Sequence, residues 1–106
     1  MASKKKAAAE KRAALPLVSD YAKSFLKDWT RLSKSGRYDM HRLKEAMLLL
    51  IANDAPLGPE WSDHGLTGKW ADTRECHIGG DFLLIYKKDD TSIIFVRTGT
   101  HAELFE

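Results

Sequence analysis

The chain has 106 residues, of which 43% are hydrophobic and 30% are charged, and its formal net charge is +2. These values exclude an intrinsically disordered chain and predict one globular domain, while so small a net charge does not by itself indicate nucleic-acid binding. The single cysteine, Cys76, cannot form an internal disulfide, and no apolar run is long enough to cross a bilayer. The N-terminus also lacks the apolar segment of a signal peptide. We therefore expect a cytoplasmic protein that does not contact a membrane.

Residues 1–14 are rich in alanine and lysine and have no apolar stripe that a folded domain could bury. We interpret them as a basic, flexible N-terminal extension, with an arm that contacts nucleic acid as the alternative. The folded domain is expected to span residues 15–106. It begins with the short apolar segment 15–18, in which Pro16 restricts a strand to the edge of a sheet or to a strand start.

Two amphipathic helices are predicted next. An N-cap at Ser19 or Asp20 precedes the first helix, which ends at Ser35-Gly36, and Asp39 caps the second, which ends at residues 53–59. Their apolar stripes consist of Tyr21, Phe25, Trp29 and Leu32, and of Met40, Leu43, Met47, Leu50 and Ile51. About five residues join the two helices, which favours an antiparallel helical hairpin.

The second half of the chain has the pattern of a long loop followed by strands. Residues 54–70 contain three glycines and two prolines, and Trp61, Leu66 and Trp70 are expected to anchor this loop. The predicted strands are 71–78, 82–86 and 93–96, with turns at 79–81 and 89–91. The order predicts an α+β domain of two layers, in which an antiparallel sheet packs on the N-terminal helical hairpin and leaves its other face open.

Polar residues converge on that open face. In the strand 71–78, alternation directs Glu75 and His77 to one side and Cys76 to the other, toward the helices. The remaining candidates lie in the loop, in the turn and at the end of the last strand. The full candidate set is His64, Glu75, His77, Asp81, Arg97 and His101.

This set matches the requirements of RNA cleavage. The reaction needs a base for the 2′-OH, a cation for the charge on phosphorus and an acid for the leaving 5′-oxygen. Histidine moves protons near neutral pH, and arginine binds phosphate through two parallel hydrogen bonds. The chemistry predicted from these residues requires no metal and no cofactor.

Each residue taken alone also has an ordinary structural interpretation. A single histidine in a loop or on a strand is usually a surface residue, and His41 is interpreted in this way. Arg97 could serve only to pair with Asp81 or Glu103. The functional hypothesis therefore depends on the whole set.

A zinc site and a cysteine nucleophile are both disfavoured. Cys76 and His77 are neighbours on a strand, so their side chains face opposite sides, and the chain has no zinc-binding motif. Cys76 is also expected to face the helices, away from the open face.

Four blocks of sequence resemble the YafQ branch of the RelE/ParE toxin superfamily, the ribosome-dependent mRNA interferases of bacterial type II toxin–antitoxin systems. They are Asp63-His64-x-Leu66-x-Gly68-x-Trp70, Arg74-x-x-His77, Leu84-Ile85-Tyr86-Lys87 and Arg97-Thr98-Gly99-Thr100-His101-Ala102-x-Leu104-Phe105. The similarity runs from about residue 15 to the end of the chain. It implies an antiparallel sheet on two helices, with a concave face that receives mRNA in the ribosomal A site.

The resemblance also implies roles for individual residues. The family's catalytic positions fall on His64, His77, Asp81, His101 and Phe105, and its phosphate-binding arginine falls on Arg97. His101 would be the general acid, the other two histidines and Asp81 would position or deprotonate the 2′-OH, and Phe105 would stack on a base. The products would be a 2′,3′-cyclic phosphate and a 5′-OH.

One departure concerns the carboxylate beside these histidines. The family has an aspartate where this chain has Glu75, which keeps the charge at the substrate site but moves it by roughly 1.5 Å. The role of Glu75 in binding substrate is therefore an expectation from the resemblance and from its place on the strand.

The partners implied by the resemblance are mRNA, the 70S ribosome and an inhibitory antitoxin of the DinJ/RelB type, which should be acidic near Arg97. Two alternatives use the same fold: a ParE-like toxin that acts on DNA gyrase, and an RNA- or ribosome-binding module without catalysis. The three histidines His64, His77 and His101 favour the nuclease, because a protein without RNA chemistry has no need to assemble them.

Overall fold

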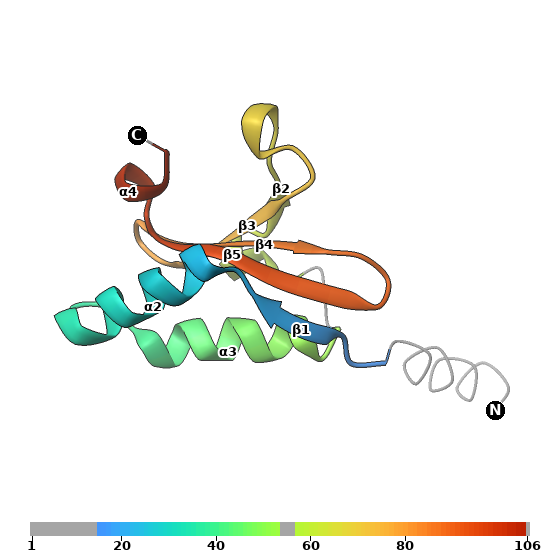
Figure 1. Ribbon diagram of the computed structural model, residues 1–106, viewed down its shortest axis with the longest axis horizontal. Helices are drawn as coiled ribbons and strands as arrows, with labels where there is room; N and C mark the ends of the chain where they lie inside the picture. Colours follow the sequence, from blue (N-terminus) through green and yellow to red (C-terminus); the bar gives the residue numbers. More distant parts are fainter. Residues whose placement is uncertain (1–14, 54–56, 106) are drawn as a thin grey trace, which may run out of the picture.

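The computed structural model describes residues 15–53 and 57–105, and its sheet is the centre of the domain (Figure 1). The strands are β1 (Val18–Tyr21), β2 (His64–Gly65), β3 (Arg74–Gly79), β4 (Phe82–Lys88) and β5 (Ser92–Thr100). They form one five-stranded sheet in the order β1-β5-β4-β3-β2. The predicted antiparallel meander is therefore confirmed as β3-β4-β5. An edge strand is present as β1, which pairs in parallel with β5, but it shares only Val18 with the predicted segment 15–18. β2 is an additional strand on the opposite edge.

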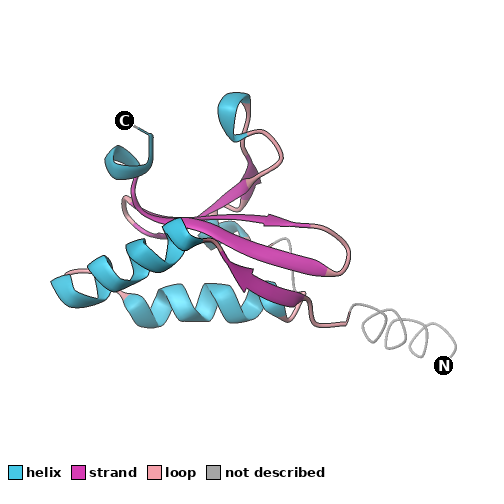
Figure 2. Cartoon of the chain, in the orientation of Figure 1, coloured by secondary structure: helices cyan, strands magenta, loops and turns pink. Residues whose placement is uncertain are grey.

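Two long helices cover one face of the sheet (Figure 2). They are α2 (Lys23–Ser35) and α3 (Met40–Ile51), and the predicted hairpin is confirmed. Gly36 ends α2 in the left-handed conformation, with φ of 71°, and the Asp39 carboxylate caps α3 by accepting the Arg42 N–H. No described helix is both long and apolar enough to span a bilayer.

The predicted start of the first helix is wrong. Ser19 and Asp20 belong to β1, and the N-cap is Ala22, whose side chain makes no capping hydrogen bond. The sheet overrides the capping signal here, because Val18 pairs with Ser92 and Tyr21 pairs with Phe95. Tyr21 still joins the aromatic cluster, since its ring stacks on Phe25 at 5.7 Å between centroids.

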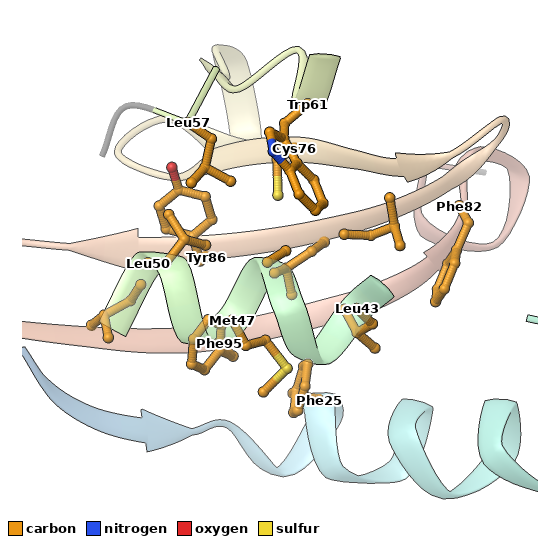
Figure 3. Packing of buried hydrophobic residues seen from close by; sticks show 14 of the residues in the cluster. Phe25, Leu43, Met47, Leu50, Leu57, Trp61, Cys76, Phe82, Tyr86 and Phe95 are labelled. Carbon is orange, nitrogen blue, oxygen red and sulfur yellow. The ribbon is translucent and has the colours of Figure 1, made fainter. Parts of the chain in front are cut away.

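The main core lies between the sheet and the two long helices (Figure 3). Phe25, Leu43 and Leu50 meet Cys76 and Phe95 of the sheet, and all five are at most 1% exposed. Cys76 faces the helices, as predicted. The helix stripes and the inward positions of the strands thus bury each other, which is what fixes the orientation of the opposite face.

The opposite face of the sheet is partly covered, whereas the prediction left it open. A second apolar cluster lies there, with Leu83, Ile85 and Leu104 buried against Leu66, Trp70, Val96 and Phe105. Leu104 and Phe105 come from a short C-terminal helix, α4 (His101–Phe105), which no pattern in the sequence predicted. Figure 1 shows α4 and the segment after β2 rising from the side of the sheet that faces away from α2 and α3.

The described part of the predicted loop, residues 57–70, contains two 3₁₀ turns, η1 (Pro59–Trp61) and η2 (Gly68–Trp70), and β2 between them. Trp61 anchors it as predicted, since the ring is 3% exposed and lies 4.0 Å below the Arg42 guanidinium. The buried Asp63 carboxylate is a second anchor that sequence did not indicate. It accepts hydrogen bonds from Tyr86 Oη at 2.6 Å, Arg74 Nε at 3.1 Å and the Leu57 N–H at 3.1 Å. The extension predicted at 1–14 and the part of the loop at 54–56 lie outside the described residues.

Candidate active site

Glu75 forms the centre of a histidine cluster on β3. The pairing of β2 with β3 sets His64 directly opposite Glu75. Glu75 Oε2 lies 3.1 Å from His64 Nε2 and 3.4 Å from His77 Nε2, so one carboxylate oxygen faces both rings. The structure therefore brings together three of the residues that the sequence predicted for the site. We refer to them as the Glu75 cluster.

His64 has an acceptor at each ring nitrogen. Its Nδ1 lies 2.7 Å from the Ser62 carbonyl oxygen, and its Nε2 faces Glu75. Both ring nitrogens of His64 thus have an oxygen partner, which fixes the orientation of the ring beside Glu75.

The other oxygen of Glu75 has no partner. The Glu75 side chain is 8% exposed, and Oε1 is buried without a hydrogen bond among the described residues. Leaving a buried acceptor unpaired costs on the order of 1–3 kcal/mol. Nothing in the packing of the sheet requires a carboxylate at this position. A buried polar group without a partner is characteristic of functional sites.

His101 and Phe105 form a second group, carried by α4. The two rings are 4.8 Å apart between centroids, and the Phe105 ring meets the edge of Trp70 at 5.6 Å. Asp81, in the turn between β3 and β4, lies next to the start of α4. Its backbone carbonyl and its carboxylate Oδ1 are 3.2 and 3.3 Å from the His101 N–H. Asp81 therefore contacts the backbone of His101, and neither ring of the Glu75 cluster.

Arg97 is held by Asp28, an aspartate of α2. Its Nε donates to Asp28 Oδ2 at 2.7 Å, and its Nη2 donates to Asp28 Oδ1 at 3.2 Å. The hydrogen bond to Asp28 raises the pKa of Arg97, which is a permanent cation. The structural interpretation of Arg97 named Asp81 or Glu103 as its partner, and the ion pair that forms is instead with Asp28. The side chain is 28% exposed, so the guanidinium is also accessible from solvent.

Asp28 is itself buried, at 4% exposure. Burial raises the pKa of its carboxyl group, but hydrogen bonds from the Arg97 side chain, the Thr98 N–H and Arg31 outweigh this effect, and the net pKa is lowered. The sequence contained a signal for this position. Asp28 follows Phe25 by three residues and precedes Leu32 by four, so it lies on the buried stripe of α2.

The sheet register relates the two halves of the site. His64 pairs with Glu75, Glu75 with Ile85, and Ile85 with Arg97, so these residues form one row across four strands. Directly opposite residues project to the same face, and adjacent strands are about 4.8 Å apart, which places the Glu75 and Arg97 backbones about 10 Å apart. Ile85 lies between them in this row and is fully buried, so the Glu75 cluster and Arg97 flank the second apolar cluster.

Cys76 and His41 lie outside the site. Burial, the largest influence, raises the pKa of the Cys76 thiol to about 12, so the group is neither a nucleophile nor a metal ligand at neutral pH. His41 is exposed on α3, as predicted. Within residues 15–53 and 57–105, no group of three or more His, Cys, Asp or Glu side chains is arranged to hold a metal ion.

Comparison with known proteins places this fold in a defined class. The sequence model of a family described as "Bacterial toxin of type II toxin-antitoxin system, YafQ" matches residues 17–106. The mRNA interferase toxin YafQ of Escherichia coli K12 is 43% identical over 86 residues, which cover 81% of this chain and 92% of the relative.

Solved structures agree with the sequence comparison. The crystal structure of YafQ from E. coli matches with a TM-score of 0.79 and 40% identity, covering 85% of this chain and 99% of the other. The E. coli DinJ-YafQ toxin-antitoxin complex matches with a TM-score of 0.78 and 40% identity, covering 87% of this chain and 100% of the other. The fold is thus the α+β fold of a RelE-like toxin. Within that class, the chain belongs to the YafQ family of bacterial toxins from type II toxin–antitoxin systems.

Proposed function

We propose that this toxin is an mRNA interferase, an endoribonuclease that cuts translated mRNA in the ribosomal A site by metal-independent acid–base catalysis. Membership of the YafQ family supports the activity, since the E. coli relative is named an mRNA interferase. The observation that carries the chemistry is the row across the sheet, which sets the Glu75 cluster opposite Arg97.

The Glu75 cluster supplies the base. In the first half of the step, the 2′-oxygen of the ribose bonds to phosphorus, and its proton passes to the histidine–carboxylate group formed by His64, Glu75 and His77. The contacts of 3.1 and 3.4 Å to Glu75 orient both rings and stabilise the positive charge that an imidazole acquires on accepting a proton. A contact between Glu75 and the substrate is also expected, from the family resemblance and from the place of Glu75 on β3.

Arg97 and His101 act on the other side of the phosphorus. The bond from phosphorus to the 5′-oxygen breaks, and His101 donates the proton that this oxygen requires. Arg97 stabilises the developing negative charge, because its guanidinium is a fixed cation with one side available to solvent. The products are a 2′,3′-cyclic phosphate and a 5′-OH. Asp81 contributes by fixing the backbone of His101, and Phe105 stacks on a base beside it.

We further propose that an acidic antitoxin of the DinJ/RelB type inhibits the toxin by covering this face. The support is the E. coli DinJ-YafQ complex, whose toxin chain matches almost the whole described domain. Arg97 supports an acidic partner on this face, because its guanidinium is a cation that is partly exposed to solvent. Co-expression with an antitoxin encoded beside the toxin should yield a stable complex that does not cut mRNA.

The experiment that tests the nuclease compares a defined mRNA on programmed ribosomes with the same mRNA free in solution. Primer extension should show cuts within codons only in the translated message, and the fragments should carry 2′,3′-cyclic phosphate ends. His101→Ala should abolish the cuts, whereas His41→Ala serves as the matched control and should not affect them. Equal cutting of free RNA would contradict ribosome dependence. Intact mRNA together with a DNA-damage response would favour a toxin acting on gyrase.

A further inference from the structure

The short helix α4 carries His101 and Phe105, and it cannot be stable without support. A helix of five residues is far below the length at which an isolated helix persists in water. The burial of Leu104 at 6% exposure ties one side of α4 to the sheet. The orientation of the other side depends on polar contacts at its first turn.

Glu103 provides those contacts through a reciprocal cap. Its Oε1 accepts the Thr100 N–H at 2.8 Å, and the Thr100 hydroxyl accepts the Glu103 N–H at 3.2 Å. This is a capping box, in which the residue before the helix and the third helical residue satisfy each other's backbone groups. His101 is the first of the two residues between Thr100 and Glu103, and it occupies the first position of the helix.

Gly99 makes room for the Glu103 carboxylate. A Cβ atom at this position would lie 2.7 Å from Glu103 Oε1 and 3.5 Å from Leu104 Cδ2, and Gly99 has a φ of 156°. The backbone of β5 therefore approaches the carboxylate more closely than a residue with a side chain would allow. Glycine at position 99 thus leaves space for the Glu103 carboxylate beside the end of β5.

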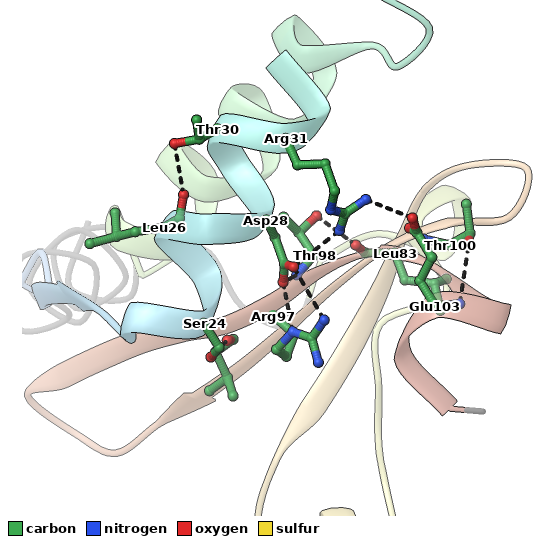
Figure 4. Close-up of polar contacts among 11 residues, drawn as sticks. Ser24, Leu26, Asp28, Thr30, Arg31, Leu83, Arg97, Thr98, Thr100 and Glu103 are labelled. Atoms are coloured by element: carbon green, nitrogen blue, oxygen red, sulfur yellow. Dashed lines mark hydrogen bonds and ion pairs between the residues drawn. The ribbon is translucent and has the colours of Figure 1, made fainter. Parts of the chain in front are cut away.

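The second oxygen of Glu103 connects α4 to the arginine proposed to bind phosphate (Figure 4). Arg31 Nη1 donates to Glu103 Oε2 at 2.6 Å, and Arg31 Nη2 donates to Asp28 Oδ1 at 3.1 Å. Asp28 in turn receives two hydrogen bonds from Arg97. A continuous series of charged contacts thus runs from Arg97 through Asp28 and Arg31 to Glu103.

We propose that Glu103 is a positioning residue, which holds His101 and Phe105 at a fixed place relative to Arg97 through the Thr100 cap and through Arg31. The proposal rests on the proposed function, because it concerns the geometry of the acid relative to the phosphate. Arg31 and Glu103 are 45% and 35% exposed, and an ion pair with that exposure contributes little to global stability. The effect of the ion pair is local, because it fixes the position of the single turn of α4.

The test uses four single variants and one double variant of the full chain in single-turnover cleavage on programmed ribosomes. Glu103→Ala removes both contacts, Glu103→Gln keeps an acceptor for the Thr100 N–H but removes the charge that faces Arg31, and Arg31→Met removes the link from the other side. Glu45→Ala, on the exposed side of α3, is the matched control for loss of one negative charge. Thermal unfolding and the amide spectrum of the sheet establish that each variant is folded.

The expected result is a loss of rate without a loss of binding. Glu103→Ala should lower the cleavage rate at saturating ribosomes about 30-fold, while Glu103→Gln and Arg31→Met each lower it a few-fold, because small displacements of an acid have large effects on rate. The half-saturating ribosome concentration should change less than twofold. The variant that combines Arg31→Met with Glu103→Gln should be no slower than the slower single variant. Glu45→Ala should cleave like the wild type.

A structural measurement that does not need cleavage separates this proposal from the nuclease itself. In the wild type, nuclear Overhauser contacts should join the rings of His101 and Phe105 and those of Phe105 and Trp70. Glu103→Ala should weaken both while the sheet remains intact. Wild-type cleavage by Glu103→Ala, or unchanged ring contacts in it, would overturn the positioning role. If the wild type does not cleave at all, the proposed function fails, and the ring contacts still decide the role of Glu103. If Glu103→Ala does not fold, Glu103→Gln decides in the same way.

Discussion

Glu75 Oε2 and His64 Nε2 face each other at 3.1 Å across the β2–β3 pair, while Glu75 Oε1 is buried and has no hydrogen-bond partner among residues 15–53 and 57–105. The carboxylate is therefore poorly placed for stability. A buried carboxylate that contacts two histidines is a candidate for a part in the proposed reaction.

Glu75→Gln tests this relationship. The change keeps the shape of the side chain and removes its charge, so the histidines lose the group that stabilises their protonated forms. We expect the cleavage rate to fall about 100-fold, within the range of a general-base contribution. The free energy of unfolding should not fall, because the variant removes a buried charge with an unpaired oxygen. A clear loss of stability in urea unfolding would indicate a structural role for the carboxylate.

Asp28→Asn tests the buried partner of Arg97. The substitution leaves Arg97 and the Thr98 N–H without a charged acceptor, and breaking a partly buried pair of this kind should cost about 2–4 kcal/mol. Urea unfolding measures this cost. The cleavage rate should also decrease, since Arg97 would lose the two contacts that orient it. Asp20→Asn, on the exposed side of β1, is the matched control and should behave like the wild type.

The same aspartate predicts a dependence of stability on acid. Asp28 has its pKa lowered from the ordinary value of 3.8, so the unfolded chain binds its proton at a higher pH than the folded chain does. The contribution of Asp28 is thus complete well above pH 4 and disappears as the pH falls through the lower folded value. The exposed Asp89 accepts hydrogen bonds in the β4–β5 turn, and these also lower its pKa, so its contribution to stability changes with pH in the same direction. Asp28→Asn should flatten the acid limb of the stability curve measured by urea unfolding, and an unchanged limb would remove Asp28 as its cause.

Tyr86→Phe tests the anchor of the segment that carries His64. Tyr86 Oη donates to Asp63 Oδ1 at 2.6 Å, and both side chains are buried. Loss of this donor should cost about 1–2 kcal/mol. Because His64 follows Asp63 directly, the cleavage rate should fall as well. Amide exchange of Leu57, whose N–H also bonds to Asp63, should become faster, and unchanged exchange would show that Arg74 alone holds the carboxylate.

Cys76 should be inert in the native protein. Its side chain is fully buried, and burial raises its pKa to about 12, so almost no thiolate exists at neutral pH. A thiol reagent should react slowly with the folded chain and rapidly in denaturant. Fast labelling of the native state would mean that β3 opens locally, since the thiol lies among the residues of the main core.

The sequence predicts the frame of this fold better than its details. The three meander strands and both helices follow from apolar periodicity, which depends on local spacing alone. The start of α2 does not, because pairing of Val18–Tyr21 with β5 converts a capping signal into a strand. The strand β2 has only two residues, too few for a pattern, and α4 forms because the sheet and Glu103 support it.

The candidate residues could be named from the sequence, but only some of the contacts between them could be predicted. His64, Glu75 and His77 do meet, as alternation along β3 and the preceding segment indicated. The partners of the charged residues could not be read from spacing alone, because Asp28 lies 69 residues before Arg97 and Arg31 lies 72 before Glu103. Asp63 belongs to the same sequence motif as His64. Its burial against Tyr86 can be recognised only in the folded chain.

The parallel pairing of β1 with β5 has a consequence for the order of assembly during synthesis. The first strand of the domain has its hydrogen-bonding partner at residues 92–95, so it cannot enter the sheet until those residues have been made. Contacts between segments far apart in a chain form late and slow the folding of a domain. Arg97 lies in the same partner strand, β5, and His101 directly follows it. A nascent copy of this toxin therefore completes its sheet in the same step that brings Arg97 and His101 to their places.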